Sequence, residues 1–335
     1  MSELAEVVRE GLTLIYGPPG AGKTSIAMRL ADTVGNRVMW ISTTEGPNFL
    51  TLAAKRVGAS PEKFAFLDFP RAFREDIAKY VLEHAHEYDA VVVDSVNGLA
   101  SSIPSLEKLA HSVFYQISRD RPVILVAEEE PRNLHYIADH VVHVWYKINS
   151  VGHLIRYFQL EKSRKRPPGP RYIFDIVEGE GIIYITMAGT RGHQEIIIDD
   201  KLGVEVPLKS TICLGAPSVK KVVKILSNIK DEAIFLQIGP WTSYRGLEIK
   251  SDQEVVVSTF HTFFELWNRL ERRELPNVRY LVVSGLLNLS EDEIYDYFYI
   301  LYAFQDYVDF LVIVNIGSSE ELEKLEKYCA ESVRF

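Results

Sequence analysis

A glycine-rich segment near the N-terminus has the residue types and the spacing that bind phosphate. Residues 17–24 read Gly-Pro-Pro-Gly-Ala-Gly-Lys-Thr. Glycines let successive backbone N–H groups point inward at the start of a helix, where a phosphate is bound. We expect Lys23 to reach the β- and γ-phosphates of a nucleotide and the Thr24 hydroxyl to ligate Mg²⁺. The predicted phosphate-binding loop, or P-loop, consists of Gly17, Pro18, Pro19, Gly20, Ala21, Gly22, Lys23, Thr24 and Ser25.

An apolar segment that ends in an acid supplies a second metal ligand. Residues 89–95 read Asp-Ala-Val-Val-Val-Asp-Ser, and such an apolar run is typical of a strand covered on both faces in a parallel sheet. Asp94 then lies at the C-terminal edge of its strand, where ligands bind in open α/β sheets. We expect it to hold Mg²⁺ together with Thr24, directly or through a water molecule.

Strand-like and helix-like segments alternate along the first half and must position these residues. This alternation predicts an α/β fold, a parallel sheet with helices on both faces. After residue 145 the long helices stop, and three further segments are expected to extend the same sheet in antiparallel fashion. The expected strands are 12–16, 37–42, 64–68, 90–94, 122–127, 141–145, 154–161, 172–178 and 181–187, and the expected helices are 25–33, 48–56, 71–86 and 106–118.

The second half of the chain repeats the first. Residues 211–222 align with residues 13–24 once the strand is shifted by one residue, and Lys221 then falls on Lys23. Later segments recur in the same order, which predicts two tandem domains of one kind. The alternative is a pair of unrelated α/β domains.

The second copy lacks the residues that would bind nucleotide and metal. Gly20 and Gly22 are replaced by Ser218 and Lys220, so backbone that must approach phosphate carries side chains. Val222 replaces Thr24 and Ser284 replaces Asp94, which removes both metal ligands. We therefore expect a nucleotide-binding domain over residues 1–188, a linker over 189–208, and a degenerate domain without a working P-loop over 209–335, retained for structure or for binding a protein partner.

Composition fits an enzyme of the cytoplasm. The chain has 335 residues, enough for two domains, and 47% of them are hydrophobic. No apolar run has the length of a membrane span, and no secretory signal is visible, so we expect no membrane association. The net charge of −9 does not favour broad nucleic-acid binding. Cys213 and Cys329 lie in apolar segments and are expected to be buried thiols.

The chain resembles the RecA-like ATPases of the KaiC and RadA group, and most closely the archaeal KaiC-like proteins. Residues 17–24 have the loop form usual in that family. Residues 158–164, Phe-Gln-Leu-Glu-Lys-Ser-Arg, and the segment 169–182 resemble the pattern that ends a KaiC domain. The resemblance covers residues 1–188, and the remainder only through the repeat. It implies two tandem RecA-like P-loop domains, the second degenerate, and the use of ATP and Mg²⁺.

The resemblance also directs the search for a catalytic base. RecA-like enzymes take the glutamate that activates water from the end of a neighbouring strand, and residues 38–46 read Val-Met-Trp-Ile-Ser-Thr-Thr-Glu-Gly. Glu45 is the acid available there, and a carboxylate in this place orients and deprotonates the attacking water. The family often has its acid one or two residues earlier, at the positions of Thr43 and Thr44. The alternative is that Glu45 is an ordinary loop residue.

Lys162 and Arg164 have two interpretations. One is a solvated basic turn, which is the usual role of a run of charges. The other follows the resemblance, in which a Lys-x-Arg pair reaches the γ-phosphate bound by an adjacent subunit and stabilises the transition state. The second interpretation is favoured because the flanking strand pattern also matches. It makes hydrolysis depend on a homo-oligomer.

Three functions stay open. The first is an ATP-hydrolysing, KaiC-like oligomeric switch whose nucleotide state controls a partner. The second is a recombinase paralogue that binds DNA in repair, and the third is a scaffold that binds nucleotide without hydrolysing it. DNA is not favoured as a partner, because the segments 95–104 and 131–136 are short and poor in basic residues.

Overall fold

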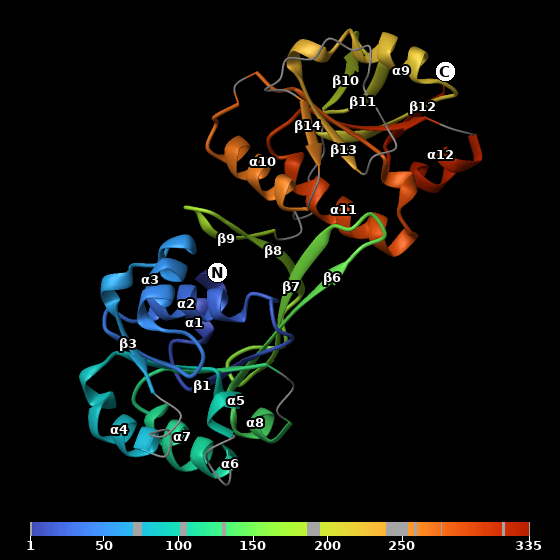
Figure 1. Ribbon diagram of the computed structural model, residues 1–335. Coiled ribbons are helices and arrows are strands. Elements are labelled where there is room, and N and C mark those ends of the chain that lie inside the picture. Colours follow the sequence, from blue (N-terminus) through green and yellow to red (C-terminus); the bar gives the residue numbers. More distant parts are fainter. Residues whose placement is uncertain are drawn as a thin grey trace. The chain divides into compact units, whose positions relative to one another are not determined.

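The structure is a computed structural model, and it describes residues 2–69, 76–100, 106–128, 132–185, 195–238, 254–257, 260–275, 277–316 and 319–334. The chain divides into two compact units (Figure 1). Unit 1 comprises Met1–Lys147 and Arg156–Tyr184, and unit 2 comprises Ile148–Ile155 and Ile185–Phe335.

Unit 1 is built on a nine-stranded sheet in the order β3-β2-β4-β5-β1-β6-β7-β8-β9. The strands from β3 to β6 are parallel, and β7 pairs antiparallel with β8. Every residue of β1, β2, β4 and β5 is buried, which explains why these strands are apolar along their whole length. The strands are β1 (Leu12–Tyr16), β2 (Val38–Ser42), β3 (Phe64–Asp68), β4 (Ala90–Asp94), β5 (Val123–Ala127), β6 (His140–Ile148), β7 (Leu154–Ser163), β8 (Arg171–Val177) and β9 (Gly181–Ile185).

Helices cover both faces of this sheet, as the alternation of elements predicted (Figure 1). One core packs α1 (Ser2–Val7), α2 (Lys23–Val34) and α3 (Pro47–Arg56) against the sheet. A second core on the other face holds the remaining helices. These are α4 (Ile77–His84), α5 (Val96–Ala100), α6 (Leu106–Leu109), a π-helical turn (Ala110–Phe114), α7 (Tyr115–Ile117) and α8 (Arg132–Ile137). The predicted helix over 71–86 is α4, with residues 71–75 outside the described part.

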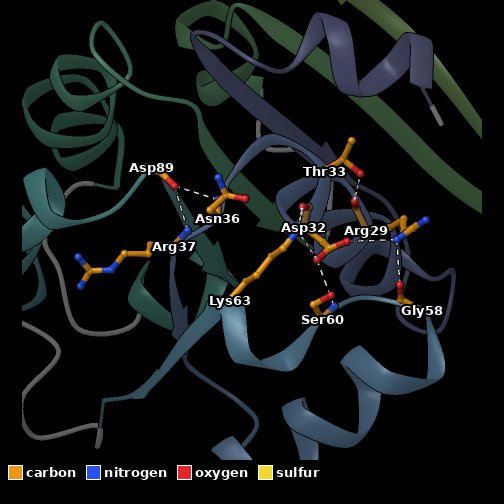
Figure 2. Close-up of polar contacts among 9 residues, drawn as sticks. All are labelled: Arg29, Asp32, Thr33, Asn36, Arg37, Gly58, Ser60, Lys63 and Asp89. Carbon is orange, nitrogen blue, oxygen red and sulfur yellow. Dashed lines mark hydrogen bonds and ion pairs between the residues drawn. The ribbon is translucent and has the colours of Figure 1, made fainter.

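Asp32, in the last turn of α2, fixes that helix to the segment before β3 (Figure 2). Its Oδ1 accepts a hydrogen bond from Ser60 N at 3.1 Å and lies 3.2 Å from Lys63 Nζ. Arg29 Nη1 lies 3.2 Å from Asp32 Oδ2 and donates to Gly58 O at 2.9 Å. The contacts hold the C-terminal end of the helix whose first turn contains Lys23 and Thr24.

Asp89 fixes the start of β2 to the start of β4 (Figure 2). Its Oδ2 accepts hydrogen bonds from the backbone N atoms of Asn36 at 2.8 Å and Arg37 at 2.9 Å. These two bonds hold the pKa of the Asp89 carboxyl below its usual value. The contact sets the register in which Ser42 lies opposite Asp94 at the far end of the pair.

Unit 2 has a two-stranded hairpin and a six-stranded sheet in the order β14-β13-β15-β16-β12-β17. All pairs in the larger sheet are parallel. The strands are β10 (Ile196–Asp199), β11 (Val204–Pro207), β12 (Ser210–Ala216), β13 (Ala233–Ile238), β14 (Glu254–Val257), β15 (Tyr280–Ser284), β16 (Phe310–Ile316) and β17 (Glu331–Arg334). The helices are α9 (Val219–Leu226), α10 (His261–Glu271), α11 (Glu291–Phe304) and α12 (Ser319–Glu326).

The two sheets share one topology. Replacing β12, β13, β14, β15, β16 and β17 by β1, β2, β3, β4, β5 and β6 turns the order of the second sheet into the first six positions of the first. The strands also follow one another along the chain in the same sequence. This agreement is what an internal repeat with conserved element order requires.

The connection after the first strand of each sheet differs between the units. Six residues, 17–22, join β1 to α2, whereas Pro217 and Ser218 alone join β12 to α9. Lys23 is the first residue of its helix, and Lys221 is the third residue of α9. Lys221 and Lys23, which the ungapped alignment pairs, therefore stand at different positions of their helices.

Two further expectations need correction. Residues 196–207, expected within a linker, form the β10–β11 hairpin, while residues 189–194 lie outside the described part. Cys213 and Cys329 are joined by a disulfide bond and are not thiols. The reason is that β17 pairs directly with β12, where Cys213 lies opposite Ser332, so residues 116 apart in sequence become neighbours.

Among the residues that the structure describes, no helix combines the length and apolar character that a membrane crossing requires.

Candidate nucleotide site

The loop between β1 and α2 has the backbone that its glycines predict. Gly17 packs against β6 so closely that a Cβ atom would lie 1.7 Å from Val144 O. Gly22 caps the N-terminus of α2 with φ of 102°, a left-handed conformation that side chains disfavour. Gly17 thus has no room for a side chain, a side chain at Gly22 would strain the backbone, and α2 begins directly after Gly22.

Lys23 lies inside the loop. It is 7% exposed, and its Nζ donates to Pro18 O at 2.9 Å. Burial lowers the pKa of the ammonium group, while the negative charges of Asp94 and Glu128 oppose that shift. A cation enclosed by a loop of backbone amides is placed to attract the phosphates of a nucleotide.

Thr24 and Asp94 come together across the start of α2 and the end of β4. The Thr24 Oγ1 atom donates to Asp94 Oδ2 at 2.7 Å. Asp94 is 8% exposed, and its burial raises the pKa of the carboxyl to about 6. Glu45 and Glu128 raise it further, whereas the Thr24 hydrogen bond and Lys23 lower it.

These two oxygen donors fit Mg²⁺. The ion prefers hard oxygen ligands and is commonly bound by one or two protein groups together with substrate phosphates and water. In the described part of the chain, no three His, Cys, Asp or Glu side chains are grouped to hold a metal by themselves. A site completed by the phosphates of the nucleotide is consistent with that finding.

Glu45 belongs to the same site. It follows β2, and its backbone N donates to Ser42 Oγ at 2.9 Å. Burial raises the pKa of the Glu45 carboxyl, and Glu45 in turn acts on Asp94 through its charge. The register of β2 and β4, with Ser42 opposite Asp94, brings the segment after β2 beside Asp94.

A cavity of 780 Å³ opens beside the P-loop. The exposed side chains of Phe49 and Leu52, 60% and 66% accessible, border it on α3. Sequence reasoning missed this wall, although the spacing of three residues between Phe49 and Leu52 places both on one helix face. The lining is Gly20, Gly22, Lys23, Thr24, Ser25, Glu45, Phe49, Leu52, Ala53, Lys55, Arg56, Val57, Arg156, Ile176, Glu178 and Gly179.

Lys162 lies away from this cavity and caps a helix of its own chain. Its Nζ donates to His135 O at 2.6 Å and to Ala138 O at 2.8 Å, at the C-terminal end of α8. Burial and the neighbouring charge of Arg164 lower the pKa of the Lys162 ammonium group. A lysine in this position satisfies the carbonyl groups that a helix end leaves unpaired.

Arg164 lies at the edge of the sheet where β1 begins. Its Nε is 2.9 Å from Asp139 Oδ1, and the other carboxylate oxygen of Asp139 accepts from Leu12 N at 2.9 Å. The P-loop starts at the opposite end of β1, five residues further on. At about 3.3 Å a residue, that separation is roughly 16 Å. The structure therefore does not bring Lys162 or Arg164 to the phosphate loop of the same chain.

The sheet order of unit 1, the loop after β1 and the acid that ends β4 define an α/β fold of the RecA-like P-loop class. The chain is similar to the DNA repair and recombination protein RadB of Methanosphaera stadtmanae, with 25% identity over 203 residues that cover 51% of this chain and 87% of that protein. This similarity is to a recombination protein and does not single out the KaiC-like branch. No model of a known protein family matches the chain.

Proposed function

We propose that unit 1 binds Mg-ATP and hydrolyses it. The observation that carries this proposal is the 2.7 Å contact between Thr24 Oγ1 and Asp94 Oδ2 at the mouth of the loop that encloses Lys23. Lys23, Thr24 and Glu45 line one cavity, and Asp94 reaches it through its contact with Thr24. A P-loop nucleotide hydrolase uses this combination of residues to bind the phosphates and the metal and to activate water.

Binding uses the first turn of α2. The backbone amides of the loop hold the phosphates, and Lys23 exchanges its contact with Pro18 O for the β- and γ-phosphates. Phe49 and Leu52 form an apolar surface against which the adenine ring packs, which fits their exposure on the rim of the cavity. Thr24 and Asp94 would hold Mg²⁺, which would neutralise charge on the phosphates.

Hydrolysis uses Glu45 as the base. Its carboxylate orients the attacking water and accepts its proton, and burial shifts its pKa toward the working pH, where a general base is most effective. The contact of Glu45 N with Ser42 Oγ fixes the start of the loop that carries this carboxylate.

Assembly is the next part of the proposal. Lys162 and Arg164 lie roughly one strand length from the phosphate loop of their own chain, so a homo-oligomer is needed for either to reach a nucleotide. In that arrangement Arg164 acts as an arginine finger on the adjacent subunit, and nucleotide state is coupled to assembly. We propose that the protein is in this way an oligomeric nucleotide-dependent switch of the KaiC-like kind.

Unit 2 is proposed to be degenerate and to serve structure or a protein partner. The two-residue connection between β12 and α9 supports this, since it leaves no loop around a phosphate. Ser284 stands at the end of β15, where β4 has Asp94, and supplies no carboxylate for a metal. One Mg-ATP per chain is the consequence.

Calorimetric titration with Mg-ATP tests binding. The expected result is one nucleotide per chain, and loss of that binding in Lys23→Ala. Two nucleotides per chain would contradict the degenerate second unit, and wild-type affinity in Lys23→Ala would contradict the assigned loop.

A second candidate is a recombinase paralogue that binds DNA in repair, and the similarity to a protein named for DNA repair and recombination favours it. Titration of single- and double-stranded DNA at two salt concentrations distinguishes it from the switch. Binding that weakens steeply with salt and depends on Mg-ATP would favour the paralogue. If the protein binds nucleotide and does not hydrolyse it, the result would favour the third function, a non-hydrolysing scaffold.

A further inference from the structure

Thr43 is a buried residue that lies two positions before Glu45 in the chain and contacts the backbone of Asp94. It is 7% exposed and directly follows the last residue of β2. Its backbone N donates to Asp94 O at 2.9 Å, which continues the β2–β4 ladder one step past the pair of Ser42 and Asp94. The main chain thus already joins the Glu45 loop to the end of β4.

The Thr43 side chain adds a second connection to the same place. Its Oγ1 donates to Ser95 O at 2.9 Å and accepts from Ser95 N at 3.1 Å. A single hydroxyl therefore satisfies both backbone groups of the residue next to Asp94. Together with the Thr43 N to Asp94 O bond, it forms a clasp between the ends of the two strands.

The first turn of α5 is built around this clasp. A Cβ atom at Gly98 would lie 2.3 Å from Thr43 Oγ1 and 2.6 Å from Thr43 Cβ. Gly98 N also donates to Ser95 O at 3.2 Å. Glycine at position 98 thus lets the helix approach until the Thr43 hydroxyl reaches the backbone of Ser95.

We infer that Thr43 is a positioning residue that holds Glu45 and Asp94 in one fixed arrangement. The inference rests on the proposed hydrolysis of ATP by this site. Thr43 is not among the residues that line the cavity. It acts because Glu45 lies two residues after it and Asp94 one residue before Ser95. A hydroxyl that ties both segments keeps the base and the metal carboxylate at a constant separation, which an in-line attack on phosphate needs.

Three variants test the clasp, and a fourth is their control. Thr43→Val keeps the shape of the side chain and removes the hydroxyl, Thr43→Ser keeps the hydroxyl, and Gly98→Ala displaces it by steric contact. Thr33→Val is the matched control, since the Thr33 hydroxyl donates to Arg29 O on the exposed side of α2, away from the site.

The first readout separates binding from turnover. Since misplacement of reacting groups by about 1 Å costs on the order of 10²-fold in rate, Thr43→Val should lower kcat by about 10- to 100-fold. The Kd for Mg-ATP should stay within about threefold, because the loop amides and Lys23 are untouched. Thr43→Ser should restore most of kcat, Gly98→Ala should lower it, and Thr33→Val should leave it unchanged.

The second readout does not depend on hydrolysis. The Ser95 amide donates to Thr43 Oγ1, so its hydrogen exchange should accelerate in Thr43→Val and in Gly98→Ala at unchanged global stability. Normal exchange in both variants would overturn the clasp itself. Faster exchange with wild-type kcat would overturn the positioning role. If the parent protein does not hydrolyse ATP, the proposed function is refuted. Hydrogen exchange of the Ser95 amide in the variants then still decides whether the clasp exists.

If Thr43→Val does not fold, Gly98→Ala and Thr43→Ser carry the test. Wild-type kcat in Gly98→Ala, or a loss in Thr43→Ser as large as that caused by removing Glu45, would then overturn the inference.

Discussion

Arg164 Nε lies 2.9 Å from Asp139 Oδ1, so a residue expected to serve a neighbouring subunit is held within its own chain. The side chain is nevertheless 60% exposed, and its backbone N also donates to Asp139 O. Lys165 and Arg166 of the same turn pair with Glu10 at 3.0 Å and Glu3 at 3.5 Å. To act on another subunit, Arg164 must exchange the Asp139 carboxylate for a phosphate.

The first prediction concerns this exchange. Arg164→Ala should bind Mg-ATP nearly normally and hydrolyse it poorly, since loss of an arginine finger costs on the order of 10³-fold in rate. Mixing it with Lys23→Ala should restore activity, because one subunit supplies the intact loop and the other the intact arginine. Lys165→Ala is the control and should hydrolyse at the parent rate. No rescue between subunits that do exchange would assign Arg164 a structural role alone.

The second prediction concerns pH. The pKa of Asp94 is raised to about 6 in the folded chain, so its protonated form is favoured by folding. Its contribution to stability is present below its ordinary pKa and is lost as the pH rises through 6. Without Mg²⁺, the free energy of unfolding should fall over this window by on the order of 3 kcal/mol.

Asp94→Asn provides the comparison for that window, because asparagine cannot ionise and its amide oxygen still accepts from Thr24. Thermal melting in a chelator should show the variant gaining stability over the parent as the pH is raised from about 4.5 to about 7.5. If the Tm of the two proteins changed with pH in parallel, ionisation of Asp94 would not destabilise the folded chain.

The third prediction concerns the Cys213–Cys329 disulfide. The bond closes a long loop, and such bonds typically stabilise by about 2–4 kcal/mol. A reductant should therefore lower the Tm of the parent and leave a Cys213→Ala, Cys329→Ala double variant unaffected. Thiol titration of the native protein should find no free thiol, and two reactive thiols under non-reducing conditions would contradict the bond.

Much of unit 1 is predictable because its strands are strongly apolar, and β1, β2, β4 and β5 are buried along their whole length. The runs of 12–16, 64–68 and 90–94 agree residue for residue with β1, β3 and β4. The same burial leaves Asp94 as the first polar residue at the end of its strand, which is why a sequence pattern could find it. The loop glycines were equally visible, since Gly17 has no room for a side chain and Gly22 requires a left-handed backbone.

Contacts between distant segments could not be predicted in this way. The pairing of β12 with β17 decides that Cys213 meets Cys329, and no local pattern contains it. The two-residue connection before α9 could not be predicted, because an ungapped alignment compares residue types and does not show where a helix begins. Lys162 was visible as a charge, but its role as the cap of α8 depends on where a separate helix ends.

The most direct test of the account is a single-turnover measurement of ATP hydrolysis by the parent and by Glu45→Gln, with the Kd for Mg-ATP measured on the same samples. Glutamine keeps the size of the side chain and the backbone contact with Ser42 Oγ but cannot accept a proton. Because a general base contributes about 10²- to 10⁴-fold, turnover should fall by that order while the Kd is unchanged. Hydrolysis by Glu45→Gln at the parent rate would contradict the assigned base and the mechanism built on it.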